Sequence, residues 1–175
     1  MSRNLFVVLT AATAAVLVLS AVAAARDVEL EEHLKPFEFL LGQTWKGTFS
    51  NSTPENPMVD VARWEAILDG KVLRGSHSLN QGQYAGETML IWDANKNSLV
   101  YFYFTNAGFY TQGTMKLEKG AIVGHEYVTG HESITEVRSE MVPRKAGGFL
   151  VVSSYLTNGE WVTGHEAVYE AVEDE

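Results

Sequence analysis

The fold is decided by residues 58–80, MVDVARWEAILDGKVLRGSHSLN, in which two alternating runs flank one tight turn. Asp69-Gly70 at the centre is typical of a two-residue hairpin loop, because both central positions of a type I′ turn need a positive φ. With that loop Ala62 faces His77 across the hairpin, and His77 shares a mostly apolar side with Trp64. The stretch therefore predicts a hairpin with one buried face.

The same pattern continues along the chain on both sides of this hairpin. Turn signals such as Asn158-Gly159 recur at short intervals between β-rich runs. The predicted strands are 43–50, 58–68, 71–80, 84–93, 98–106, 109–118, 121–129, 133–142, 148–157 and 160–171. Leu30, Leu34, Phe37 and Leu41 recur at helical spacing and predict one short helix, or two turns, before Gly42. We therefore predict an all-β protein, an up-and-down antiparallel barrel of about ten strands with a short N-terminal helix.

The first 25 residues have the features of a secretory signal peptide rather than of the fold. Arg3 precedes an uncharged apolar run, which ends in Ala23-Ala24-Ala25 before a charged stretch. An uncleaved anchor is the alternative, since about 20 apolar residues can span a bilayer. We expect cleavage near Ala25, a single barrel domain over 26–175, and a secreted or periplasmic protein with no stable membrane insertion.

Composition excludes several functions. The 175 residues carry a net charge of −9, which disfavours binding to nucleic acid. The chain has no cysteine, so thiolate nucleophiles, disulfides and Cys-ligated metal centres are excluded. No nucleophile elbow and no phosphate-binding glycine loop is found either. Hydrolysis and nucleotide binding are therefore not expected.

Several short motifs carry a family resemblance that covers most of residues 35–170. They are Phe39–Gly47 (FLLGQTWKG), Leu68–Leu73 (LDGKVL), Ile91-Trp92-Asp93, the segment Gly108–Gly113 and a final strand ending near Tyr169. Together they resemble lipocalin-like barrels of the DUF1579-type family and, more distantly, the nitrobindin-like haem-binding barrels. The first resemblance implies a calycin-type barrel with a lumen. The second implies haem, with a histidine of a late strand as the axial ligand, which is His165 here.

The hairpin patterns also predict which side chains face the lumen. If the Asn158-Gly159 turn has two residues, Val152 faces His165, and His165 lies on the same face as Trp161 and Tyr169. His125 is ambiguous, because a two-residue loop at Lys119-Gly120 turns it outward and a three-residue loop turns it inward. The predicted ligand-binding residues of the lumen are Trp45, Trp64, His77, Trp161, His165 and Tyr169.

Three functions fit these residues. The first is binding of a small, largely apolar molecule in the lumen without turnover, since a barrel of more than eight strands leaves interior space. The second is haem binding at His165. The third is an enzyme in which His77 or His165 transfers a proton, with a carboxylate such as Glu87 as partner. A protein-only metal site is not expected, because His and Glu in each Gly-His-Glu tripeptide point to opposite faces of a strand. A purely structural or interaction role stays open as a fourth alternative, as do oligomeric state and ligand identity.

Overall fold

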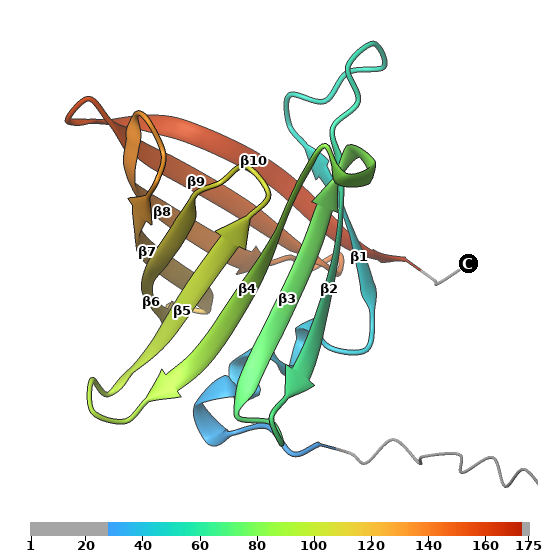
Figure 1. Cartoon of the computed structure of the whole chain (residues 1–175). Coiled ribbons are helices and arrows are strands. Elements are labelled where there is room, and N and C mark those ends of the chain that lie inside the picture. The colour runs from blue at the N-terminus through green and yellow to red at the C-terminus, as the bar shows by residue number, and fades with distance from the viewer. Residues whose placement is uncertain (1–27, 173–175) are drawn as a thin grey trace, which may run out of the picture.

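The computed structural model describes residues 28–172, which form a closed antiparallel β-barrel (Figure 1). In chain order the elements are η1 (Glu32–Leu40), β1 (Thr44–Phe49), β2 (Val59–Ile67), β3 (Val72–Leu79), η2 (Asn80–Gly82), β4 (Tyr84–Asp93), β5 (Ser98–Thr105), β6 (Tyr110–Glu118), β7 (Ala121–Thr129), β8 (Ile134–Pro143), β9 (Phe149–Thr157) and β10 (Glu160–Val172). Each strand pairs with the next along the chain, and β1 pairs with β10 to close the sheet. The predicted ten-stranded meander with a short N-terminal helix is confirmed.

The predicted signal peptide, residues 1–25, lies outside the described residues. Between residues 28 and 172, no helix is long and apolar enough to cross a bilayer.

The hairpin of β2 and β3 has the register that its sequence predicts. Ala62 pairs with His77, and Trp64 pairs with Gly75. The Lys71 N–H donates to the Leu68 carbonyl (3.2 Å), which closes the two-residue loop. Since successive side chains of a strand point to opposite faces, this register sends every second side chain of β2 into the barrel.

Helix η1 closes one end of the barrel (Figure 1). Its side chains Leu34, Phe37 and Leu40 are at most 3% exposed and join the core. The indole N–H of Trp45 donates to the Leu40 carbonyl (2.9 Å), which ties the end of the helix to β1. Apolar burial on this scale is the main stabilising contribution in a domain of this size. Side chains of η1 thus pack into the end of the lumen that the helix covers.

A β-bulge in β10 overturns the predicted register of the last hairpin. Thr163 pairs with Ser154 as expected, but Val152 pairs with Glu166 instead of His165, so Gly164 and His165 together face Ser153. One extra residue in a strand reverses which faces the following side chains occupy. A Cβ at Gly164 would lie 2.4 Å from the Ser153 Oγ, so the bulge depends on this glycine.

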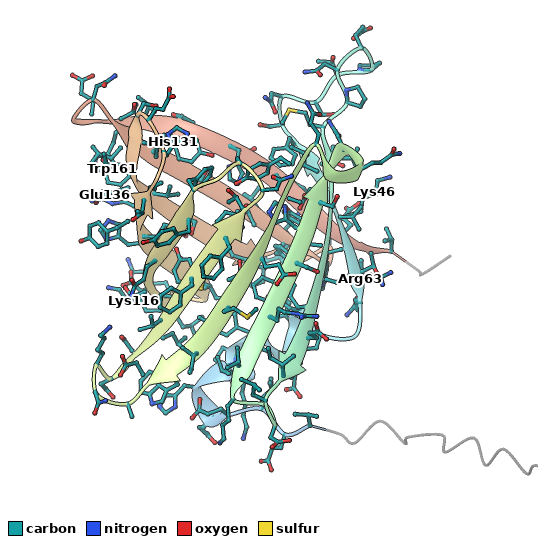
Figure 2. The ribbon with its side chains drawn as sticks, in the orientation of Figure 1. Lys46, Arg63, Lys116, His131, Glu136 and Trp161 are labelled. Carbon is teal, nitrogen blue, oxygen red and sulfur yellow. The ribbon has the colours of Figure 1, made fainter. Side chains whose placement is uncertain are left out.

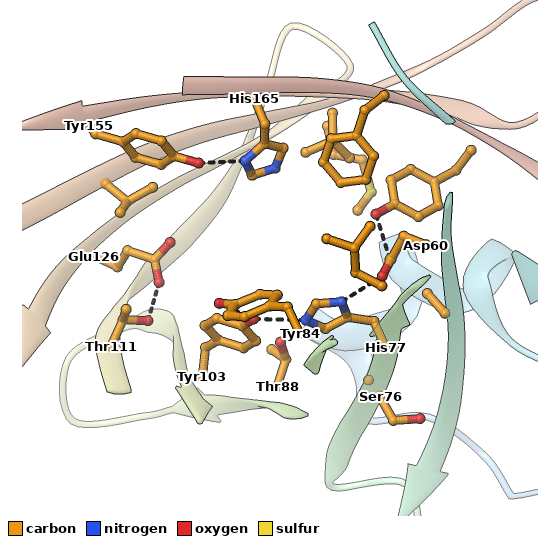
Figure 3. A pocket seen from close by; sticks show the side chains of 18 of the residues that line it. Asp60, Ser76, His77, Tyr84, Thr88, Tyr103, Thr111, Glu126, Tyr155 and His165 are labelled. Carbon is orange, nitrogen blue, oxygen red and sulfur yellow. Dashed lines mark hydrogen bonds and ion pairs between the residues drawn. The ribbon is translucent and has the colours of Figure 1, made fainter. Parts of the chain in front are cut away.

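The bulge separates two residues that the sequence placed on one face. Trp161 precedes the bulge and lies on the outer surface (Figure 2). The Arg138 guanidinium stands 4.0 Å from its ring centre. His165 is the second residue of the bulge and faces the lumen (Figure 3). The prediction that Trp161 shares a face with His165 and Tyr169 is therefore wrong.

The hairpin of β6 and β7 settles the orientation of His125. Glu118 pairs with Ala121, so the loop between them has two residues. His125 accordingly lies on the outside, where its ring is near those of Tyr127 and Trp161. The next residue, Glu126, points inward.

Candidate functional site

The barrel encloses a cavity of about 470 Å³ (Figure 3). It reaches toward the end opposite η1, where Met58, Leu79 and His131 border it (His131 is labelled in Figure 2). Most of its wall is apolar or aromatic, and the large rings are those of Phe49, Trp64, Tyr84, Tyr103, Phe109, Phe149, Tyr155 and Tyr169. Small-molecule sites in proteins usually have this size and this mixture of apolar wall and few polar groups.

A chain of hydrogen bonds runs along one side of the cavity, from Asp60 to Tyr84. The Nδ1 of His77 lies 2.8 Å from Asp60, and its Nε2 lies 2.7 Å from the Tyr103 hydroxyl. That hydroxyl lies 2.8 Å from the hydroxyl of Tyr84. Because a carboxylate only accepts, Nδ1 is the donor to Asp60. The two tyrosine protons can then align in either direction along the chain, depending on whether Nε2 accepts or donates.

Asp60 ends this chain of hydrogen bonds, and its side chain is held in place. Its carboxylate is 1% exposed and accepts a second hydrogen bond, from the Tyr169 hydroxyl (2.9 Å). The Tyr169 ring stacks on Phe149 at 4.9 Å between centroids. Burial and the nearby Asp60 raise the pKa of Tyr169 far above its ordinary value, so its hydroxyl keeps its proton and remains a donor. Two strands distant in sequence thus hold the Asp60 side chain in one position.

His165 stands on the other side of the cavity with its own partners. Its Nδ1 lies 2.6 Å from the Tyr155 hydroxyl and 3.0 Å from the Ser153 Oγ, whereas Nε2 has no hydrogen-bond partner among the described residues. Burial lowers the pKa of His165, because desolvation disfavours the imidazolium. A neutral imidazole with one nitrogen free therefore faces the cavity.

Glu126 brings a carboxyl group to the same space from β7. Its side chain accepts a short hydrogen bond from the Thr111 hydroxyl, and Figure 3 shows the second carboxyl oxygen pointing away from Thr111. Burial raises the pKa of Glu126, because desolvation outweighs the hydrogen bond from Thr111, which favours the carboxylate. This group was not among the residues predicted for the lumen.

The structure brings together four of the six predicted lumen residues. Trp64, His77, His165 and Tyr169 line the cavity. The other two lie elsewhere: Trp45 is buried in the core beside the cavity, 4.9 Å from Phe149 between ring centroids, and Trp161 is on the outer surface. Trp45 is excluded because η1 fills that end of the lumen.

The acidic partner proposed for His77 was the wrong residue. Glu87 is exposed on β4, and Asp60 takes the expected position. The sequence did contain a signal for Asp60, because it has the same parity as Ala62 and Trp64 on β2 and so lies on the apolar side of the hairpin. A charged residue on an apolar face is unusual unless it is paired.

The donor set does not suggest a protein-only metal centre. Among residues 28–172, no three His, Cys, Asp or Glu side chains gather closely enough to hold a metal ion.

Comparisons with known proteins support the fold. No family model and no curated protein matches the chain. The crystal structure of Rv2717c from M. tuberculosis is similar, with a TM-score of 0.60 and 11% sequence identity over 83% of this chain and 100% of that chain. At this identity the likeness concerns the barrel fold alone.

Proposed function

We propose that this barrel binds a small, largely apolar molecule in its lumen. The observation that carries the proposal is the cavity of about 470 Å³, whose wall is mainly aromatic and aliphatic while its polar groups are gathered in a few fixed clusters. In such sites the apolar wall supplies affinity and the polar groups orient the ligand. The chain from Asp60 through His77 to Tyr84 and the pair His165–Tyr155 are the two orienting groups.

Binding fits the geometry better than proton transfer by His77. Both ring nitrogens of His77 lie within 2.8 Å of protein groups, so neither is left for a substrate. The position of Asp60 between His77 and Tyr169 instead favours a role in holding the imidazole still. We therefore assign the cluster an orienting role.

The proposal is tested by titrating the protein with the neutral lipophilic probe N-phenyl-1-naphthylamine. Trp64 is the one tryptophan lining the cavity among the described residues, so we expect probe binding to quench its emission. This quenching should be absent in Trp64→Phe. Native mass spectrometry should give one probe per chain.

A matched pair of variants locates the binding site. Val128 and Tyr127 are neighbours on β7, and Val128 lines the cavity whereas Tyr127 is 60% exposed. Val128→Trp should fill the lumen and lower probe affinity at least tenfold, and Tyr127→Trp should leave it unchanged. Equal affinity in both variants would place the probe outside the barrel and refute the proposal.

Haem binding is a second candidate, and His165 is the observation that favours it. The resemblance to nitrobindin-like barrels implies an axial histidine at this position. The surroundings of His165 suit an axial ligand to haem iron. Burial keeps the imidazole neutral, Tyr155 and Ser153 contact Nδ1, and Nε2 faces the lumen. Bound haem would supply an iron centre for electron transfer or for binding small gases. Among the described residues lining the cavity none is a Lys or Arg, so haem propionates would have to lie at the mouth.

Haemin titration separates the two candidates. A Soret band that shifts on mixing and is lost in His165→Ala, with unchanged far-UV circular dichroism, would support haem. A spectrum identical to free haemin, or a shift that persists in His165→Ala, would exclude His165 as a ligand.

Export is proposed from the first 25 residues. N-terminal sequencing of the protein purified from its host should begin close to Arg26, and a chain that retains Met1 in the cytosol would refute it.

A further inference from the structure

A smaller chamber of about 160 Å³ lies between the main cavity and helix η1. Phe37 and Leu40 of η1 form part of its wall. It adjoins the main cavity, because six residues line both spaces: Trp64, Thr88, Tyr103, Glu126, Met141 and Val151. A ligand in the main cavity could therefore extend one end into this chamber.

The chamber holds a buried hydroxyl whose hydrogen bonding is incomplete. The Tyr101 side chain is 3% exposed, and its hydroxyl lies near the side chains of Glu126 and Ser139 but forms no hydrogen bond of good geometry with any described residue. A buried hydroxyl left unbonded costs about 1–3 kcal/mol, so such groups normally meet a protein atom, a water or a ligand. The Ser139 Oγ lies beside it, since a Cβ built on Gly124 would be 2.6 Å from Ser139 Oγ and 3.2 Å from the Tyr101 hydroxyl.

Glu126 supplies a carboxyl group to the same chamber, and the wall contains no basic partner for it. It is 9% exposed and bonded to Thr111 through one oxygen. Among the described residues that line either space, none is a Lys or Arg. The chamber wall therefore includes the Glu126 carboxyl group and the hydroxyl residues Thr88, Tyr101, Tyr103 and Ser139, together with the exposed Glu140, and among the described residues it has no Lys or Arg that would favour an anion.

We propose that this chamber binds the protonated amino group of a lipophilic amine, with Glu126 as its counter-ion. The inference rests on the proposed function, since the apolar part of the amine would occupy the main cavity. An ammonium group has three donors, and the oxygens of Glu126, Tyr101 and Ser139 are three acceptors. One proton is shared between amine and carboxyl group, so the ion pair forms without net charge in the barrel.

Head-group discrimination tests the inference. n-Octylamine, 1-octanol and octanoate carry the same chain and differ only at the head, and each is titrated against protein loaded with N-phenyl-1-naphthylamine at pH 7.5. We expect octylamine to displace the probe at a concentration at least tenfold lower than octanol, and octanoate to be the weakest. Octylamine no better than octanol would overturn the inference and leave the proposed function intact, whereas failure of the probe itself to bind would defeat both.

Two variants assign the preference to the chamber. Glu126→Gln should lower the affinity for octylamine at least tenfold and change the affinity for octanol less than twofold. Glu87→Gln replaces an exposed glutamate of the outer surface in the same way and should change neither affinity. Tyr101→Phe removes only the hydroxyl and should weaken octylamine binding about fivefold, which keeps the test decisive if Glu126→Gln does not fold. An amine preference that survives both substitutions would overturn the inference.

Discussion

Replacing Asp60 by alanine should strongly destabilise the barrel. The carboxylate is 1% exposed and accepts hydrogen bonds from His77 (2.8 Å) and from Tyr169 (2.9 Å). Each hydrogen bond to a charged group contributes about 1.5–3 kcal/mol, so losing two should cost about 3–6 kcal/mol. That is a large part of the roughly 5–15 kcal/mol that stabilises an ordinary domain. Equilibrium unfolding in urea, followed by tryptophan fluorescence, measures the loss.

Three further variants separate the carboxylate from the space it fills. Tyr169→Phe removes one of the two bonds and keeps the ring stacked on Phe149, so it should cost about 1.5–3 kcal/mol. The double variant Asp60→Ala/Tyr169→Phe should lose less stability than the sum of the two single variants, and the difference should also be about 1.5–3 kcal/mol. Asp60→Asn keeps one acceptor oxygen for His77, and its amide N–H can donate to the Tyr169 hydroxyl oxygen, so it should cost less than half as much as alanine. Val61→Ala, at an outward and 42% exposed neighbour, serves as the control. A loss below about 1 kcal/mol in Asp60→Ala, or simple additivity in the double variant, would refute the reasoning.

Three other predictions concern single positions. Gly47→Ala should destabilise the fold by about 1–3 kcal/mol in urea unfolding, since its Cβ would lie 2.5 Å from the Tyr169 ring, and Lys46→Ala should not. Burial raises the pKa of Glu126, so the folded state keeps a proton that the unfolded state loses. The free energy of unfolding should therefore fall as pH rises above 4.5, and Glu126→Gln should make it depend less on pH. Burial lowers the pKa of His165, so the unfolded state takes up a proton at a higher pH than the folded state does. The free energy of unfolding should therefore fall as pH drops below 6.5, and His165→Gln should remove this fall.

The architecture could be predicted because its determinants are local. Alternation along a strand and the turn at Asp69-Gly70 depend on residues only a few positions apart, and together they set the register that pairs Ala62 with His77. Where one hairpin follows another without interruption, closing into a barrel is the arrangement that leaves no open edge. The strand count and the direction of His77 followed from these rules.

The candidate site was predicted less completely because it depends on contacts across the barrel. Asp60 and Tyr169 are 109 positions apart, and no local pattern indicates that they meet. The exclusion of Trp45 from the cavity likewise depends on where η1 docks, which the strand pattern does not specify. Trp161 was misplaced for a different reason, since the bulge at Gly164 is a local feature with no sequence signal beyond the glycine itself.

The three Gly-His-Glu tripeptides show how much the backbone decides. In β7 the strand is regular, so His125 faces solvent and Glu126 faces the lumen. In β10 the bulge reverses that assignment, and His165 points inward. At the third copy the chain turns, and the Nδ1 of His131 accepts hydrogen bonds from the N–H groups of Ser133 and Ile134 (3.2 and 3.1 Å). The three copies of this tripeptide thus play different parts: one gives the lumen a carboxyl group, one gives it an imidazole, and one caps a loop at the mouth. A motif shared in sequence therefore supports no common role here, and each copy has to be interpreted from the φ/ψ and register of its own strand.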